Sequence, residues 1–252
     1  MIYPYRETLL SQLYPGNQHS THCLQAAVEG FEEILNLPKK KRLSIVWRLD
    51  GGFGADKHIN WLVDRNYQVI AKGASSSRSP NLGRQVKRWL QVGHSKWVAR
   101  VKSPAIVKPQ VQTFPLRYLT KERYKYRYLY STLGLYSRKT LQFYDYRGGA
   151  ETEFRADKTG GLLLHTRRKQ KWEAQVAWIL LTDIVHNYLS WFSHHILADS
   201  PFASWGPLRI TRDLFRIPGH ITLSQDGLLF VSLSKSHPFA ADLLPCLARF
   251  WM

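Results

Sequence analysis

The chain has 252 residues, of which 36 are Lys or Arg and 18 are Asp or Glu, so its formal net charge is +18. A hydrophobic content of 44% and an aromatic content of 13% exclude a disordered chain and predict one sizeable core, or a core that carries an insertion. A folded chain this basic repels itself at low salt unless its partner is a polyanion. The composition therefore favours nucleic acid as the partner, ahead of a membrane surface.

Cysteine usage and apolar stretches indicate the compartment. Cys23 and Cys246 lie far apart, without a second Cys at metal spacing, which argues against a disulfide framework and a zinc site and fits a reducing cytosol. No signal peptide pattern is present at the N-terminus. The longest apolar stretch, residues 176–192, contains an Asp, a His and an Asn, so it is interpreted as a buried helix. We expect a cytoplasmic protein that does not enter a membrane.

The first ninety residues follow an α/β order. Apolar residues recur at helical spacing over residues 20–37. Residues 43–50 have the pattern of a buried strand, and the glycines of residues 51–54 predict a turn. A helix is predicted over residues 57–65 and a strand over residues 67–71. The order strand, turn, helix, strand is typical of an α/β sheet.

From about residue 93 the chain predicts short strands separated by prolines. Between Tyr124 and Tyr130 every second residue is a tyrosine, which is the period of a strand. Between Lys96 and Lys139 there are eleven Lys and Arg but one acidic residue, Glu122. This part of the chain is predicted to be a basic β-rich insertion.

Helical periodicity returns at Tyr144 and continues to about Leu197, with a Gly-Gly break at residues 160–161. A hairpin is predicted over residues 221–231, with Asp-Gly at its turn, and a helix over residues 240–250. The predicted organisation has four parts: residues 1–92 and 143–200 as an α/β core, 93–142 as the insertion, and 201–252 as a small α+β extension.

Asp50 is the first candidate site residue. It follows an apolar strand and precedes a Gly-rich turn, and ligand and metal sites in open α/β sheets gather at the carboxyl ends of strands. An Asp at this position can equally cap the following helix, so both interpretations stand. A dinucleotide-binding loop is disfavoured, because the third glycine of the motif would fall on Lys57.

The second candidate is a stripe of charged side chains after residue 143. On one helix its five members would fall within an arc of about 80°. They are Tyr144, Arg147, Glu151, Arg155 and Lys158. Such a stripe is usually a solvated face with ion pairs one turn apart. The functional alternative is a carboxylate that holds a divalent cation while its neighbours bind phosphates.

The spacing Tyr-x2-Arg-x3-Glu-x6-Lys, met at Tyr144, Arg147, Glu151 and Lys158, resembles the signature of a large family of DDE-type DNA transposases of the insertion-sequence class. Three other segments resemble parts of this family: residues 16–20, 48–54 and 177–187. The basic β-rich insertion is also similar to one that the family carries. The resemblance covers nearly the whole chain.

The resemblance implies an RNase H-like catalytic core that cleaves DNA and joins strands during transposition. In this family two aspartates and a glutamate bind divalent ions, normally Mg²⁺, with Mn²⁺ as a substitute. Asp50 and Glu151 would be two of the three catalytic metal ligands.

By the same resemblance, Tyr144, Arg147 and Lys158 would contact transposon-end phosphates. The basic insertion would add phosphate contacts that position DNA without reading its sequence, and Trp97 or the tyrosines would stack on a base. The implied partners are double-stranded DNA and a second copy of the chain during synapsis, with no small-molecule substrate. A cytoplasmic, nucleoid-associated location follows.

The sequence departs from the family at its first aspartate. Residues 1–49 contain no Asp, so we expect a chain truncated at its N-terminus, with a core that lacks its first strand. Gly148 and Gly149 predict that the helix of Glu151 begins near Ala150. We expect that the chain alone does not cut DNA. A truncated protein that only binds DNA or interferes with transposition is the first alternative, and an RNase H-like nuclease or resolvase is the second.

Overall fold

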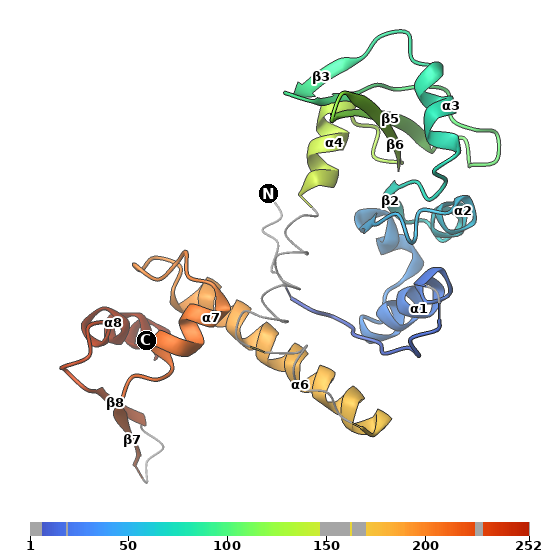
Figure 1. Ribbon diagram of the computed structural model, residues 1–252. Helices are drawn as coiled ribbons and strands as arrows, with labels where there is room; N and C mark the ends of the chain where they lie inside the picture. Colours follow the sequence, from blue (N-terminus) through green and yellow to red (C-terminus); the bar gives the residue numbers. More distant parts are fainter. Residues whose placement is uncertain (1–6, 19, 147–161, 163–169, 225–228, 252) are drawn as a thin grey trace. The chain divides into compact units, whose positions relative to one another are not determined.

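The computed structural model describes residues 7–18, 20–146, 162, 170–224 and 229–251. The chain divides into two compact units (Figure 1). We call residues 14–148 the sheet unit, and residues 1–13 together with 149–252 the helical unit. The expected α/β class is confirmed, because helices accompany a mixed six-stranded sheet.

The sheet unit is built on six strands in the order β1-β2-β6-β5-β4-β3. Their bounds are Val46–Leu49 (β1), Gln68–Lys72 (β2), Leu90–Gly93 (β3), Lys96–Val98 (β4), Gln112–Thr120 (β5) and Arg123–Ser131 (β6). β1 and β2 are parallel, and every other pair is antiparallel. The strands of the predicted insertion therefore continue the sheet that β1 and β2 begin.

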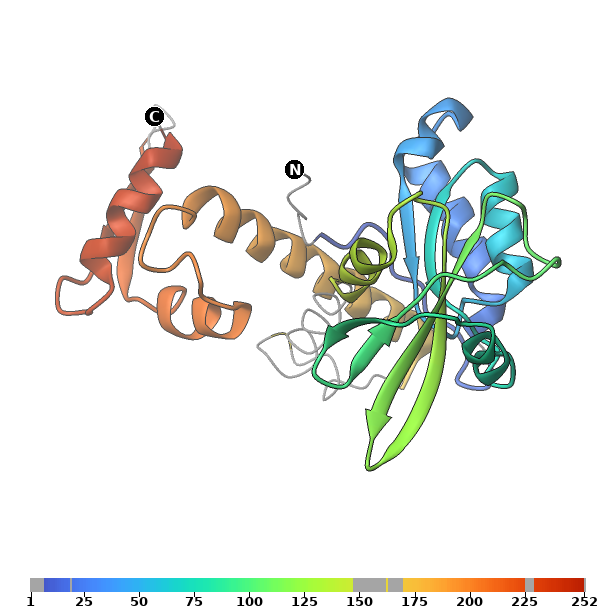
Figure 2. The same cartoon turned by 90° about the horizontal axis from the view of Figure 1, so that it is seen from above.

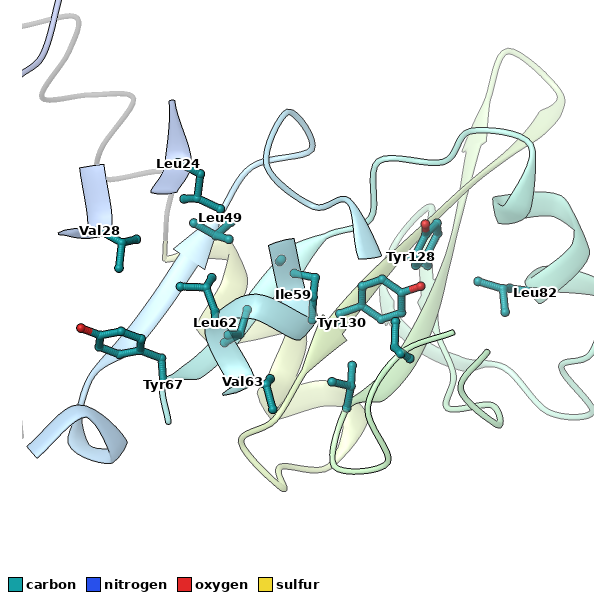
Figure 3. Close-up of a cluster of buried hydrophobic side chains, with 14 residues drawn as sticks. Leu24, Val28, Leu49, Ile59, Leu62, Val63, Tyr67, Leu82, Tyr128 and Tyr130 are labelled. Carbon is teal, nitrogen blue, oxygen red and sulfur yellow. The ribbon is translucent and has the colours of Figure 1, made fainter. Parts of the chain in front are cut away.

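Helices cover both faces of this sheet (Figure 2). Side chains of α1 (Leu24–Ile34), α2 (Asp56–Asp64) and α3 (Arg78–Arg84) pack in one core cluster with Tyr128 and Tyr130 of β6 (Figure 3). α4 (Ser137–Asp145) contributes to the core on the opposite face, where Leu129 is buried. The two-residue alternation of β6 explains this division, because neighbouring side chains of a strand point to opposite faces.

Two short 3₁₀ helices, Ser20–His22 and Lys39–Ser44, complete the sheet unit. The helices predicted over residues 20–37 and 57–65 are confirmed as α1 and α2, with ends shifted by a few residues. The strand predicted over residues 43–50 is confirmed as the shorter β1, because the 3₁₀ turn occupies its first residues.

The helical unit contains α6 (Trp172–Trp191), which continues as a π-helical turn, Phe192–Ile196. After it come α7 (Pro207–Arg209), a second π-helical turn (Ile210–Leu214), the hairpin of β7 (Gly219–Leu223) and β8 (Leu229–Leu233), and α8 (Ala240–Trp251). Its core includes Leu189, Phe202 and Leu243. The predicted C-terminal hairpin and helix are confirmed, while the Asp-Gly turn lies outside the described residues.

The segment that begins at residue 7 is bound to α6. The side-chain oxygen of Asn187 accepts a hydrogen bond from the backbone N–H of Thr8 at 2.7 Å, and its amide nitrogen donates one to the Thr8 carbonyl at 2.8 Å. α6 is not buried on all sides as expected, since Leu180, Ile184 and Tyr188 are exposed on one face. None of the helices within the described ranges is long and apolar enough to cross a membrane.

Candidate functional site

Asp50 lies directly after β1, at the carboxyl end of the parallel pair. Its side chain is exposed, and its carbonyl accepts a hydrogen bond from the Phe53 N–H at 2.9 Å, which closes the turn that the glycines allow. Lys72 ends β2 at the same edge of the sheet. A β-carbon placed on Gly51 would lie 3.6 Å from Lys72 Cδ, so the lysine stem passes beside the turn. A carboxylate and an ammonium group thus occupy one sheet edge.

The turn after Asp50 is fixed to the end of β2 by a close backbone approach. A β-carbon on Gly54 would come within 1.7 Å of the Lys72 carbonyl oxygen, so no larger residue fits there. The Ala74 N–H also donates a hydrogen bond to the Gly54 carbonyl at 3.1 Å. Because both strands constrain the turn, Asp50 is positioned by rigid elements, as a metal ligand requires.

Arg48 connects the strand of Asp50 to α4. Its guanidinium carbon lies 5.4 Å from the centre of the Phe143 ring, and its Nη1 donates a hydrogen bond to the Phe143 carbonyl at 3.3 Å. The structure therefore brings together two segments that the sequence singled out separately, residues 48–54 and the start of the charged stripe at residue 144.

Tyr144 is placed differently from the expectation. It lies on α4, which ends at Asp145, and its side chain is 7% exposed, packed in a core cluster with Leu129 and Leu141. A tyrosine in this position contributes to the core of the sheet unit. The other members of the stripe, Arg147, Glu151, Arg155 and Lys158, lie outside the described residues. Within the described ranges no group of three His, Cys, Asp or Glu residues is arranged to hold a metal ion.

Asp56, the first residue of α2, is a second carboxylate considered as a metal ligand, and both its oxygens already accept hydrogen bonds. Arg78 Nη1 and Nη2 donate hydrogen bonds to its two oxygens at 2.6 and 2.7 Å, and the Tyr130 hydroxyl donates another at 2.8 Å. Burial raises the pKa of Asp56, but the hydrogen bonds from Arg78 and Tyr130 and the charge of Arg78 outweigh burial and lower the pKa below its usual 3.8. Asp56 is therefore a structural carboxylate that joins α2, α3 and β6.

The outer half of the β5–β6 hairpin has two different faces. On one face the guanidinium carbon of Arg117 lies 4.8 Å from the ring centres of both Trp89 and Trp97 and 4.5 Å from that of Tyr124. The ring of Tyr126 lies against Gly83, where an added β-carbon would come within 2.6 Å of it. We call this set of side chains the aromatic face.

Most of the tyrosines of β6 that were expected to stack on a base are too buried to do so. Tyr128 and Tyr130 are buried, and Tyr126 is half-buried, so none of these three rings offers a free face of any size. Tyr124 is 49% exposed but is in edge contact with Trp97, with ring centres 5.9 Å apart. The alternating tyrosines of β6 therefore serve chiefly to pack the sheet against neighbouring side chains.

The opposite face of the hairpin is basic. Arg123, Lys125 and Arg127 alternate along β6 and are all exposed. They belong to a strongly asymmetric charge distribution, because residues 14–148 hold 24 of the 36 Lys and Arg but 8 of the 18 Asp and Glu. Nearly all the net positive charge of the chain, +16 of +18, thus resides in the sheet unit.

Comparisons with known proteins give no family for this chain. No family model matches the sequence, and no curated protein matches it significantly.

The sequence did not predict the Asp56–Arg78 pair or the position of Lys72. The alternation of β5 predicts that Arg117 points to the face opposite to Leu116 and Tyr118. Its three aromatic neighbours could not be predicted, because they come from separate segments.

Proposed function

We propose that this chain is part of a DDE-type DNA transposase with an RNase H-like core. Its sheet unit would bind duplex DNA, and Asp50 and Glu151 would be two carboxylates of the site for DNA cleavage and strand transfer. The observation that carries the proposal is the exposed Asp50 at the carboxyl end of β1, beside parallel β2, where α/β sheets gather metal and ligand sites. The spacing of Arg147, Glu151 and Lys158 supports it.

The carboxylate oxygens of Asp50 and Glu151 suit a hard cation such as Mg²⁺, or Mn²⁺ in its place. When bound, such ions activate water or a DNA 3′-hydroxyl and stabilise the leaving oxygen. In the reaction the attacking oxygen forms a new bond to phosphorus while the bond to the leaving 3′ oxygen breaks. Lys72, at the edge that holds Asp50, is placed to offset the negative charge of the phosphate.

The charge of the sheet unit supports the choice of DNA as substrate. Neutralisation of phosphates by Lys and Arg releases counterions, and this release drives binding to duplex DNA with a strong dependence on salt. A unit with 24 basic and 8 acidic residues has the charge for such binding. DNA bound in this way would be oriented with little regard to sequence.

A second candidate function is DNA binding without cleavage. It is favoured by the excess of basic residues in the sheet unit, 24 against 8 acidic ones, and by Asp56, whose carboxylate is occupied by hydrogen bonds from Arg78 and Tyr130. We expect these 252 residues alone to bind DNA and not to nick it, because only two carboxylates of the family's set, Asp50 and Glu151, are identified among them.

The experiment combines binding and cleavage on the same preparation. The full chain is mixed with supercoiled plasmid and Mg²⁺ or Mn²⁺, and bound and nicked DNA are separated on gels. Retardation without nicking supports DNA binding by a chain that does not cleave on its own. Nicking that Glu151→Gln abolishes would show that the chain is a complete nuclease and would overturn the non-cleaving part. Absence of retardation at low salt would overturn the DNA-binding function itself.

A further inference from the structure

Three cations on β6 form a regular row on one face of the β5–β6 hairpin. Arg123 pairs with Thr120, Lys125 with Tyr118, and Arg127 with Leu116. Successive members of the row are two strand residues apart, about 6.8 Å, which is comparable to the spacing of phosphates along one DNA strand. Within the described residues, no carboxylate forms an ion pair with any of the three. We call Arg123, Lys125 and Arg127 the cation row.

The hairpin that carries the row is rigid and projects beyond the helices that cover the sheet (Figure 2). Strands β5 and β6 pair without a break from Gln112–Ser131 to Thr120–Arg123. The two residues between them, Lys121 and Glu122, both have positive φ, 43° and 63°. This is the geometry of the tight two-residue turn that matches the twist of a hairpin, so the register of the row is fixed up to the tip.

The aromatic face holds the hairpin from the other side. Arg117 is packed among Trp89, Trp97 and Tyr124, and Tyr126 is packed on Gly83 of α3. These rings contact one another and the protein, so they support the hairpin; Tyr124 is 49% exposed but packs edge-on against Trp97. A ligand of the hairpin is therefore expected to meet the cation row, through charge.

We propose that the cation row binds the phosphate backbone of duplex DNA independently of base sequence. The inference rests on the proposed function for the identity of the polyanion, and it deepens that function by assigning the contact to one face of one hairpin. Phosphate contacts of this kind position DNA and leave the reading of bases to other groups. The row thereby places a DNA segment beyond the sheet edge that carries Asp50.

The test measures how DNA affinity depends on salt. Each phosphate contact contributes roughly 0.9 to the slope of log K against log salt concentration. The full chain and the triple variant Arg123→Gln/Lys125→Gln/Arg127→Gln are titrated onto a fluorescent duplex of arbitrary sequence, and anisotropy is followed at several salt concentrations. The matched control, Lys39→Gln/Lys40→Gln/Lys41→Gln, removes the same charge from an exposed 3₁₀ helix of the same unit.

We expect the slope of the cation-row variant to fall by roughly 2 to 3 and its affinity at low salt to fall at least tenfold, with a change in slope below about 1 for the control. Equal losses in both variants would show a general charge effect and would overturn the inference. A cation-row variant that binds like the wild type would overturn the inference and leave the proposed function standing. Failure of the wild type to bind duplex DNA would overturn both the inference and the proposed function. Binding to single-stranded DNA or RNA alone would overturn the assignment of duplex DNA as the ligand.

Two checks keep the result interpretable. The melting temperature of each variant, followed by circular dichroism, must match that of the wild type, as is expected for exposed side chains. If the triple variant is unstable, Lys125→Gln alone is used, and the expected loss of slope is about 0.9. An unchanged slope for this single variant would contradict the assignment of Lys125.

Discussion

Asp50 and Lys72 are neighbours across the parallel strands β1 and β2. The register pairs Leu49 with Ala71, so Asp50 follows β1 at the level where Lys72 ends β2. The contact of the Lys72 stem with the turn at Gly51 agrees with this placement. Lys72 thus lies close enough to the proposed metal ligand Asp50 to neutralise a phosphate bound there.

Replacement of Lys72 tests that role. Lys72→Gln is expected to weaken binding of duplex DNA about three- to tenfold, because a charged contact to phosphate is lost, whereas Lys72→Arg keeps the charge and is expected to bind within about twofold of the wild type. Anisotropy titrations at one low salt concentration measure both. Equal affinity of Lys72→Gln and the wild type would remove Lys72 from the DNA site.

The Asp56–Arg78 pair predicts a stability effect that is separate from function. Asp56→Asn leaves Arg78 without its carboxylate in a partly buried place, and we expect the free energy of unfolding at pH 7 to fall by roughly 1 to 3 kcal/mol. Urea unfolding followed by tryptophan fluorescence measures it. A loss below about 1 kcal/mol would mean that the pair contributes little.

The pH dependence of the same variant provides a second readout. The pKa of folded Asp56 lies below its ordinary value of 3.8, since hydrogen bonds from Arg78 and Tyr130 outweigh burial. Its stabilisation is therefore fully present above that ordinary value and is lost as the pH falls through the lower, folded pKa. The difference in unfolding free energy between wild type and Asp56→Asn is expected to shrink on acidification below pH 4. A difference that grows instead would contradict the direction of the shift.

Gly73 is required by its contact with Tyr128. A β-carbon at position 73 would lie 1.9 Å from Tyr128 Cε2, so Gly73→Ala must displace a buried ring and is expected to cost roughly 2 kcal/mol. Gly16→Ala is the matched control, because an added β-carbon there meets nothing within 4 Å. Thermal melting compares the two. Similar melting temperatures for both variants would show that the ring moves aside at no cost.

Substitution of Arg117, in the aromatic face, is expected to lower stability without changing DNA binding. Arg117→Gln removes a cation from three rings and is expected to destabilise the sheet unit by about 1 to 2 kcal/mol. Its salt slope for DNA binding is expected to stay within about 0.5 of the wild-type value, because Arg117 is enclosed and makes no phosphate contact. Unfolding in urea and anisotropy titration on one preparation give both numbers. A loss of slope near 0.9 would place Arg117 on the DNA instead.

Local patterns predicted the elements that local sequence determines. α1, α2 and β6 follow from their 3.6- and two-residue periods, and the position of Asp50 follows from the apolar run before it. α3 was not anticipated, because its sequence contains Ser, Pro and Gly, and its first residue is held by a partner on α2, 22 residues away in the chain. Such a contact has no signature in the local sequence.

Relationships between distant segments could not be predicted from the sequence. The pairing of β2 with β6 joins Ile70 to Ser131, and the register of that pairing makes the basic strands part of the main sheet. The burial of Tyr144 on α4 could not be predicted for a similar reason, while its phosphate contact stays a prediction. A helical wheel that starts at Tyr144 shows a charged stripe, but α4 begins at Ser137 and buries Tyr144 together with Leu141.

The most direct test of the central claim asks whether Asp50 and Glu151 hold the same divalent ion. The full chain is loaded with Fe²⁺ in place of Mg²⁺, and ascorbate and hydrogen peroxide then generate radicals that cut the backbone beside the bound iron. Asp64→Asn is the control, because Asp64 is exposed and pairs with Lys108. We predict fragments that end near residue 50 and near residue 151, lost together in Asp50→Asn and in Glu151→Gln and retained in the control. Cuts near residue 151 that persist in Asp50→Asn, or no localised cuts at all, would contradict the assignment of a shared metal site.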